Sequence, residues 1–201
     1  MLVKDFLQRL RRRLIDEGFH AKFSDEELLA SLNQEQNILI SDFEMNVQHF
    51  SKQISSDDNV LHLPKLALKI VHARLNAKAI PLKNYKYALE NENPTLHVMS
   101  YSNMQSLAVL PQIKANGLFE VWVNLCVFQD DENENLFLND LFVNALLYSC
   151  FKNVLQSENS EFSLQKMNFY EALFEKESSR LKKLVSDTRE KQVFFSKVSR
   201  V

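Results

Sequence analysis

The chain has 201 residues, of which 45% are apolar and 25% charged, and its formal net charge is -2 at neutral pH. This composition is ordinary for a globular protein with a buried core, and the small net charge argues against a chain that binds nucleic acid or anionic membranes over its whole surface. Glycine occurs only at positions 18 and 117. Phosphate-binding P-loops and dinucleotide-binding glycine motifs are therefore excluded, because both require closely spaced glycines.

The first quarter of the chain predicts helices. Residues 2–16 have apolar side chains at helical spacing. Ser24 and Glu27 have the spacing of a capping box, in which each side chain binds the other residue's backbone amide at the start of a helix. We expect this second helix to continue to about residue 52, because apolar residues recur at helical spacing through Phe50.

The middle of the chain predicts β structure. Residues 60–63 look extended, and residues 96–101, 104–110 and 118–128 alternate between apolar and polar side chains as strands do. Residues 66–75 fit either a strand or a short helix. Together these segments predict a small antiparallel β unit between helical parts.

The last third returns to helical periodicity after an acidic loop at residues 129–135. Apolar residues recur at helical spacing over 136–156 and again over 163–188. Residues 190–201 do not continue that pattern, and we expect them to form an extended tail that carries apolar anchors.

These elements predict a fold that is mainly α, with a small antiparallel β insertion. A helical bundle of about four helices is expected from residues 1–56 and 136–189, with a β-hairpin unit inserted at 57–130. We expect residues 1–189 to form one domain and residues 190–201 to form a C-terminal docking tail.

The sequence contains no familiar catalytic or metal-binding motif. Its five histidines are scattered, and Cys126 and Cys150 are far apart and outside any metal-ligand spacing. We therefore expect no enzyme activity, no metal and no cofactor. An enzyme with an unrecognised site is one alternative, and it predicts a cleft with converging titratable groups. A helical scaffold of a host cell is another.

The expected location is intracellular at synthesis. The first residues lack the continuous apolar core of a signal peptide, and no stretch reaches the length and apolarity of a membrane span. Two isolated cysteines also fit a reducing compartment, with no disulfide.

Charge is separated along the chain. The acidic loop contains Asp130, Asp131, Glu132 and Glu134. We interpret it as a solvated loop rather than a cation site, because no glycine or alternating oxygen-ligand pattern would shape a cage. The tail, by contrast, is basic and apolar, with candidate docking residues Arg189, Lys191, Phe194, Phe195, Lys197 and Arg200. A docking arm and a frayed, solvated terminus explain the tail equally well.

A second basic group lies in the first helix, at Arg9, Arg11, Arg12 and Arg13. The arginines either form a solvated face that pairs with neighbouring carboxylates or contact phosphates. The second possibility leads to the alternative function of a nucleic-acid-binding module that uses this helix and the basic tail.

The order of these elements resembles the head-to-tail adaptor (connector) family of tailed bacteriophages. The opening of the second helix, Phe-Ser-Asp-Glu-Glu-Leu-Leu at 23–29, is similar to the family's aromatic–Ser–Asp–x–Glu–Leu–Leu, and Leu32 to Gln36 follow as in the family. An extended Leu63-Pro64 step, a hydrophobic hairpin near 96–128 and an acidic turn then precede two closing helices. Within these, Asn139 to Tyr148 and Tyr170 to Phe174 look similar to the family.

The resemblance implies a structural virion protein that forms a ring, usually of twelve copies, in the neck between capsid and tail. Its partners would be the portal protein, a tail or nozzle protein and further copies of itself. Genomic DNA would pass through the ring without sequence-specific contacts. Charge separation suits such a ring, because an acidic patch on one copy can meet a basic patch on the next.

Overall fold

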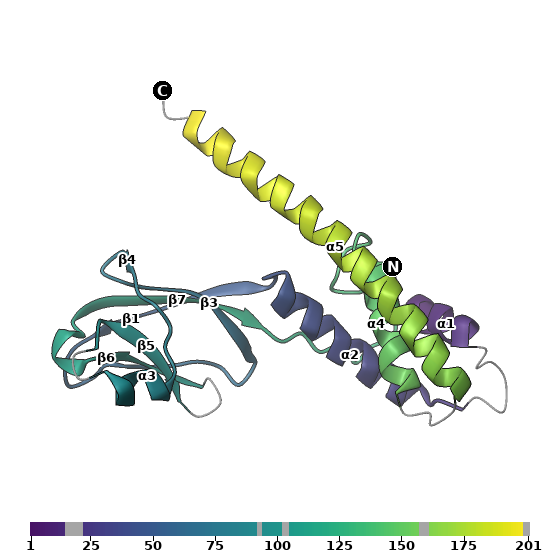
Figure 1. The fold of residues 1–201 in the computed structure, drawn as a ribbon, viewed down its shortest axis with the longest axis horizontal. Helices are drawn as coiled ribbons and strands as arrows, with labels where there is room; N and C mark the ends of the chain where they lie inside the picture. The colour runs from purple at the N-terminus through teal and green to yellow at the C-terminus, as the bar shows by residue number, and fades with distance from the viewer. Residues whose placement is uncertain (15–21, 92–93, 102–104, 157–160, 199–201) are drawn as a thin grey trace. The chain divides into compact units, whose positions relative to one another are not determined.

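The computed structural model describes residues 1–14, 22–91, 94–101, 105–156 and 161–198. The chain forms two compact units (Figure 1). Residues 1–39 and 127–201 make the first, which we call the helical unit, and residues 40–126 make the second, which we call the β unit.

Four helices have all or most of their length in the helical unit: α1 (Val3–Leu14), α2 (Asp25–Asp42), α4 (Val143–Leu155) and α5 (Glu161–Val198). The predicted capping box opens α2 and is confirmed. The Ser24 amide donates to Glu27 Oε2 at 2.8 Å, and the Glu27 amide donates to Ser24 Oγ at 3.1 Å. Both bonds satisfy amides that the first turn of a helix leaves without intrahelical partners.

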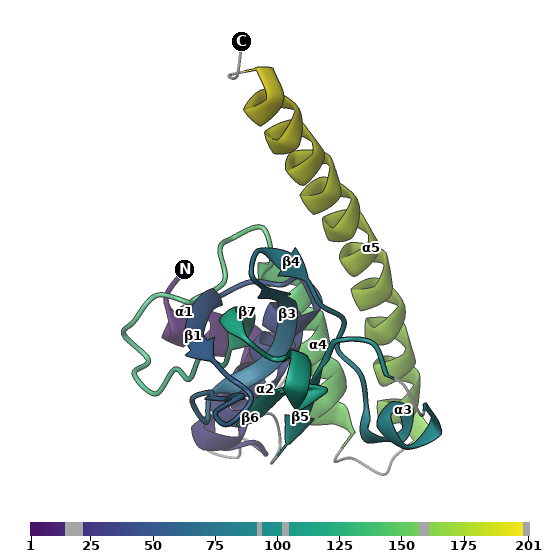
Figure 2. The same ribbon diagram turned by 90° about the vertical axis from the view of Figure 1, so that its left-hand side faces the viewer.

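The pair α4 and α5 packs together through aromatic side chains. Phe151 of α4 stacks on Tyr170 of α5, with ring centroids 4.3 Å apart and planes 17° from parallel. α4 has 13 residues and α5 has 38, which correspond to about 20 Å and about 57 Å of helix. Figure 2 shows α5 continuing well beyond the end of α4.

Two asparagines of α2 bind the chain where it leaves the last strand. The Asn37 side chain forms two hydrogen bonds with the backbone of Val127, and Asn33 forms two with the backbone of Gln129. Asparagines four residues apart lie on one face of a helix, so they meet alternate residues of an extended segment. This contact positions the acidic loop that follows.

The β unit contains two antiparallel sheets among the described residues. One has the order β1-β7-β3-β4, and the other has the order β2-β6-β5. The bounds are β1 (Val47–Ile54), β2 (Val60–His62), β3 (Ala67–Leu75), β4 (Lys78–Ala79), β5 (His97–Tyr101), β6 (Ser106–Leu110) and β7 (Gly117–Leu125), with the short helices α3 (Tyr85–Glu90) and η1 (Gln112–Lys114) between strands. β1, β7 and β3 lie side by side in both views (Figures 1 and 2).

The two sheets share one apolar core. β7 buries Phe119, Val121 and Val123, and these side chains belong to the same cluster as Leu107 and Val109 of β6. The alternate residues of β7 therefore point to the outer face of its sheet, because side chains alternate along a strand.

Gly117 marks the start of β7. Its φ is +125°, which L side chains rarely adopt, and a Cβ at this position would overlap the Asn76 amide. That amide fixes the turn, since Asn76 Oδ1 accepts from the Leu118 amide at 2.9 Å.

The expected fold class is wrong. Helices make up 45% and strands 26%, and the described residues contain seven strands in two sheets, so the protein is not mainly helical with a small β-hairpin unit. Short strands that are partly exposed on one face carry weak sequence signals, and the alternating segments looked like one hairpin rather than two sheets with a common core.

The expected length of the second helix is also wrong. α2 ends at Asp42, and β1 begins at Val47. Glu44 and Asn46 between them have positive φ angles of 51° and 49°, which end a helix and redirect the chain. Phe43, Val47 and Phe50 are spaced as on a helix, but β1 pairs with β7 along its full length instead.

The C-terminal segment differs from its predicted form as well. α5 continues to Val198, so residues 190–198 have a helical backbone where an extended tail was expected. The reason is that α5 contains no glycine or proline, and Glu190, Lys191 and Gln192 all favour helix.

Candidate interaction surfaces

The acidic loop is held at the start of α1. The amide of Lys4 donates to the Glu132 carbonyl at 2.9 Å, and the amide of Val3 donates to the Glu134 carbonyl at 3.0 Å. These bonds satisfy first-turn amides of α1 and place acidic residues at the positive end of its dipole. The four predicted carboxylates, Asp130, Asp131, Glu132 and Glu134, are all exposed.

The buried side chain of Gln129 holds the acidic loop through hydrogen bonds to its backbone. Its side chain is 3% exposed, its Nε2 donates to the Asn135 carbonyl at 2.7 Å, and its Oε1 accepts from the Phe137 amide at 3.2 Å. Within the loop, Asp131 Oδ1 accepts from the Asn133 amide at 2.8 Å. The loop thus presents the carboxylates of Asp130, Glu132 and Glu134 from a fixed backbone.

The four arginines of α1 do not act as one patch. Arg11 is bound within the chain, since its Nη1 donates to the Phe23 carbonyl at 2.8 Å and its Nη2 to Asp25 Oδ1 at 2.6 Å. The side chains of Arg9, Arg12 and Arg13 are exposed. Arg11 therefore ties α1 to the start of α2, and three arginines face solvent.

The structure does not describe the side chains of the candidate docking residues in the C-terminal segment. Arg189, Lys191, Phe194, Phe195 and Lys197 fall on the described backbone of α5, and Arg200 lies beyond it. Upstream of them, Leu181 is fully buried whereas Leu184 is 40% exposed. No side chain from 182 to 187, the described ones that follow Leu181, is buried.

The outer face of the four-stranded sheet carries a cluster that the sequence did not predict. We call His49, His72, Arg74, Glu120 and Trp122 the Trp122 cluster. The register places His49, Trp122 and His72 in one row across β1, β7 and β3, with Glu120 and Arg74 in the next row. Trp122 is the sole tryptophan of the chain.

The Trp122 ring contacts side chains from both neighbouring strands, β1 and β3. The His49 ring stacks on it with centroids 4.6 Å apart, and the Arg74 guanidinium lies 5.1 Å from its centroid. Arg74 Nε donates to His72 Nε2 at 2.9 Å, and His49 Nε2 lies 3.3 Å from Glu120 Oε1. The alternation of β7 could have indicated Glu120 and Trp122, but the expected helix through residue 52 hid His49.

A second polar group lies between α2 and α4. Asn153 Nδ2 donates to Glu35 Oε1 at 3.0 Å. Burial raises the pKa of the Glu35 carboxyl, although hydrogen bonds from Asn153 and Ser149 and the charge of Lys152 oppose this. Burial also raises the pKa of the neighbouring Cys150 thiol well above its ordinary value, and Glu35 adds to that rise. A fully buried, protonated thiol is a poor nucleophile.

A pocket of about 140 Å³ lies next to this group. It is lined by Phe23, Glu27, Ser31, Asn153 and Val154. Two of its polar groups are already used within the chain, because Glu27 caps α2 and Asn153 binds Glu35.

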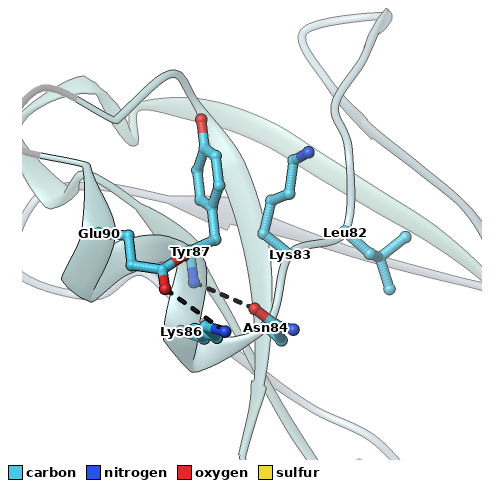
Figure 3. A pocket seen from close by; sticks show the side chains of 6 residues that line it. All are labelled: Leu82, Lys83, Asn84, Lys86, Tyr87 and Glu90. Carbon is cyan, nitrogen blue, oxygen red and sulfur yellow. Dashed lines mark hydrogen bonds and ion pairs between the residues drawn. The ribbon is translucent and has the colours of Figure 1, made fainter.

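A larger pocket of about 390 Å³ lies beside α3 and is lined by residues of this helix and of the segment just before it (Figure 3). Lys83 Nζ lies 4.7 Å from the centre of the Tyr87 ring, and Lys86 pairs with Glu90 at 3.5 Å. Asn84 Oδ1 accepts from the Tyr87 amide at 3.0 Å. Both lysines therefore contact side chains of the same six-residue helix, α3.

No group of three or more potential metal ligands occurs among the described residues. None of the described helices combines the length and the apolarity that a membrane span requires.

The sequence was also compared with known proteins. No protein-family model and no curated protein matches the chain.

Proposed function

We propose that this chain is a head-to-tail adaptor of a tailed bacteriophage, which forms a ring between the portal protein and the tail and extends the DNA channel. The observation that carries the proposal is the overhang of α5, residues 182–198, which adds about 25 Å of helix after Leu181, the last fully buried side chain among those that the structure describes. A short isolated helix is marginal in water, so this segment is best explained by a partner.

The helical unit supports an assembly role in a second way. Its acidic loop is exposed but anchored at both ends, through Gln129 and the amides of Val3 and Lys4. An anchored, charged loop suits a contact that must form in one register, because little conformational freedom is lost on binding.

The first test is density-gradient fractionation of a phage lysate, with mass spectrometry for this chain. The expected result is co-migration with intact tailed particles at a copy number similar to that of the portal protein. Recovery of the chain only from the soluble fraction would contradict the proposal.

The role of the overhang is tested in the same lysates. Leu184→Asp should reduce incorporation into particles, because it places a charge on the apolar stripe of the overhang. Lys183→Asp is the matched control, since Lys183 is exposed and adjacent. Equal incorporation of both variants would show that the overhang does not mediate docking into particles.

Nucleic-acid binding is the second candidate function, and the exposure of Arg9, Arg12 and Arg13 favours it. It predicts that the purified chain binds duplex DNA with an affinity that falls steeply with salt. Arg9→Ala combined with Arg13→Ala should then weaken binding and flatten the salt dependence. Absence of binding by the unmodified chain at low salt would exclude this candidate.

A further inference from the structure

We propose that the Trp122 cluster is a docking site for carboxylates of a second copy of this chain, and that the acidic loop at residues 130–134 is the segment that docks there. This inference rests on the self-association in the proposed function and names its contact.

Arg74 is the residue of the cluster that is oriented to bind an anion. The Arg74 guanidinium lies over the Trp122 ring, and its Nε donates to His72, so these two contacts orient its terminal nitrogens. Among the residues that the structure describes, no carboxylate lies within ion-pair distance of Arg74. Glu120, its direct neighbour across the strands, lies against His49 instead. A planar, preoriented guanidinium matches a carboxylate through two parallel hydrogen bonds.

The geometry favours an acidic protein segment over a nucleic acid. Stacking of a base needs an open aromatic face. The Trp122 ring already stacks on His49 and has the Arg74 guanidinium 5.1 Å from its centroid, so it is not an open platform. The cluster also contains one arginine and one carboxylate rather than a run of cations along a groove. Tryptophan and arginine are also enriched among the residues that dominate the binding energy of protein interfaces.

The acidic loop is the complementary surface on this same chain. Asp130, Glu132 and Glu134 are exposed on a backbone that Gln129 and the first amides of α1 hold in place. Charges of opposite sign on two rigid surfaces favour their encounter and fix the register of the contact. The loop and the cluster are different surfaces, so the contact can repeat head to tail from copy to copy until a ring closes.

A charge exchange between two chains tests this contact directly. The first variant is Arg74→Glu, and the second combines Glu132→Lys with Glu134→Lys. Each variant alone sets like charges against each other and should self-associate about tenfold more weakly than the unmodified full-length chain in sedimentation velocity. An equimolar mixture of the two variants should recover association, because each chain then carries the charge that complements the other.

Two controls accompany the exchange. Lys83→Glu makes the same change of charge elsewhere in the β unit and should associate like the unmodified chain. Arg74→Lys keeps the charge but removes the planar guanidinium, so it should fall between Arg74→Glu and the unmodified chain. Circular dichroism must show that every variant is folded, and fluorescence of the sole tryptophan should shift when unmodified chains associate.

The outcomes separate this inference from the proposed function. Undiminished association of Arg74→Glu, or failure of the mixture to recover, would overturn the inference even when the chain co-migrates with particles. An unmodified chain that remains monomeric at the highest soluble concentration would overturn the contact between copies as well. Absence of the chain from particles contradicts the adaptor role alone, because the exchange experiment uses purified protein.

Discussion

The side chain of Asn37 forms two reciprocal hydrogen bonds with the backbone of Val127: its Oδ1 accepts from the Val127 amide at 2.8 Å, and its Nδ2 donates to the Val127 carbonyl at 2.9 Å. Asn33 repeats the arrangement with Gln129, at 2.8 Å and 2.9 Å. A helix thus supplies the hydrogen-bonding partners that a neighbouring strand would otherwise give to this extended segment. The acidic loop begins where the second of these contacts ends.

Replacement of Asn37 by alanine should destabilise the protein by about 1–3 kcal/mol, because it leaves a peptide group of Val127 without partners. Asn37 is 9% exposed, so water cannot fully replace the lost bonds. The measurement is urea-induced unfolding followed by circular dichroism. Gln34→Ala, at an exposed position of the same helix, should show no loss. A similar stability for both variants would mean that the paired hydrogen bonds contribute little.

Replacement of Gln129 by alanine should release the acidic loop. The substitution removes both bonds that the buried amide makes to Asn135 and Phe137. Hydrogen exchange should therefore become faster over residues 130–137, while exchange in α4 should change little. Glu134→Gln is a control within the loop, because the Glu134 side chain is exposed. Unchanged exchange in the Gln129 variant would show that the contacts with α1 hold the loop by themselves.

Stability should depend on pH through Glu35. Its pKa is raised in the folded chain by burial, so the folded state binds the proton more tightly than the unfolded state does. This contribution to stability is fully present below the ordinary glutamate pKa and is lost as the pH rises through the raised pKa. Glu35→Gln should therefore gain stability relative to the unmodified chain as the pH rises through this window.

The measurement for Glu35 is the urea midpoint of both proteins at a series of pH values. Glu175→Gln, at an exposed position of α5, is the control and should not gain stability in this way. A difference between Glu35→Gln and the unmodified chain that stays constant with pH would contradict the assignment.

Replacement of Arg11 by alanine should cost about 1–2 kcal/mol, whereas Arg9→Ala and Arg13→Ala should be near neutral. Arg11 binds the Phe23 carbonyl and the Asp25 carboxylate, and its side chain is 17% exposed. Thermal unfolding of the three variants provides the comparison. Equal losses in all three would indicate that the arginines act through general charge instead of the specific contact at Arg11.

The structure also explains why some sequence predictions succeeded and others failed. The capping box of Ser24 and Glu27 is a local pattern of four residues, and it was confirmed. β1 could not be assigned locally, because Val47 and Phe50 fit a helix and its strand conformation is fixed by pairing with β7, far along the chain. That single error concealed the position of His49 and with it the Trp122 cluster.

The sequence by itself determined the local features of this protein: the start of α2, the helical stripes of α1 and α4, the strong strand β7, and the exposed acidic loop. Each depends on residues within a few positions of one another. Only the tertiary structure decided that the strands of the described residues form two sheets, that Arg74 lies over Trp122, and that Gln129 holds the loop. These features join residues from distant segments, and their geometry depends on strand register and helix contacts that no local pattern encodes.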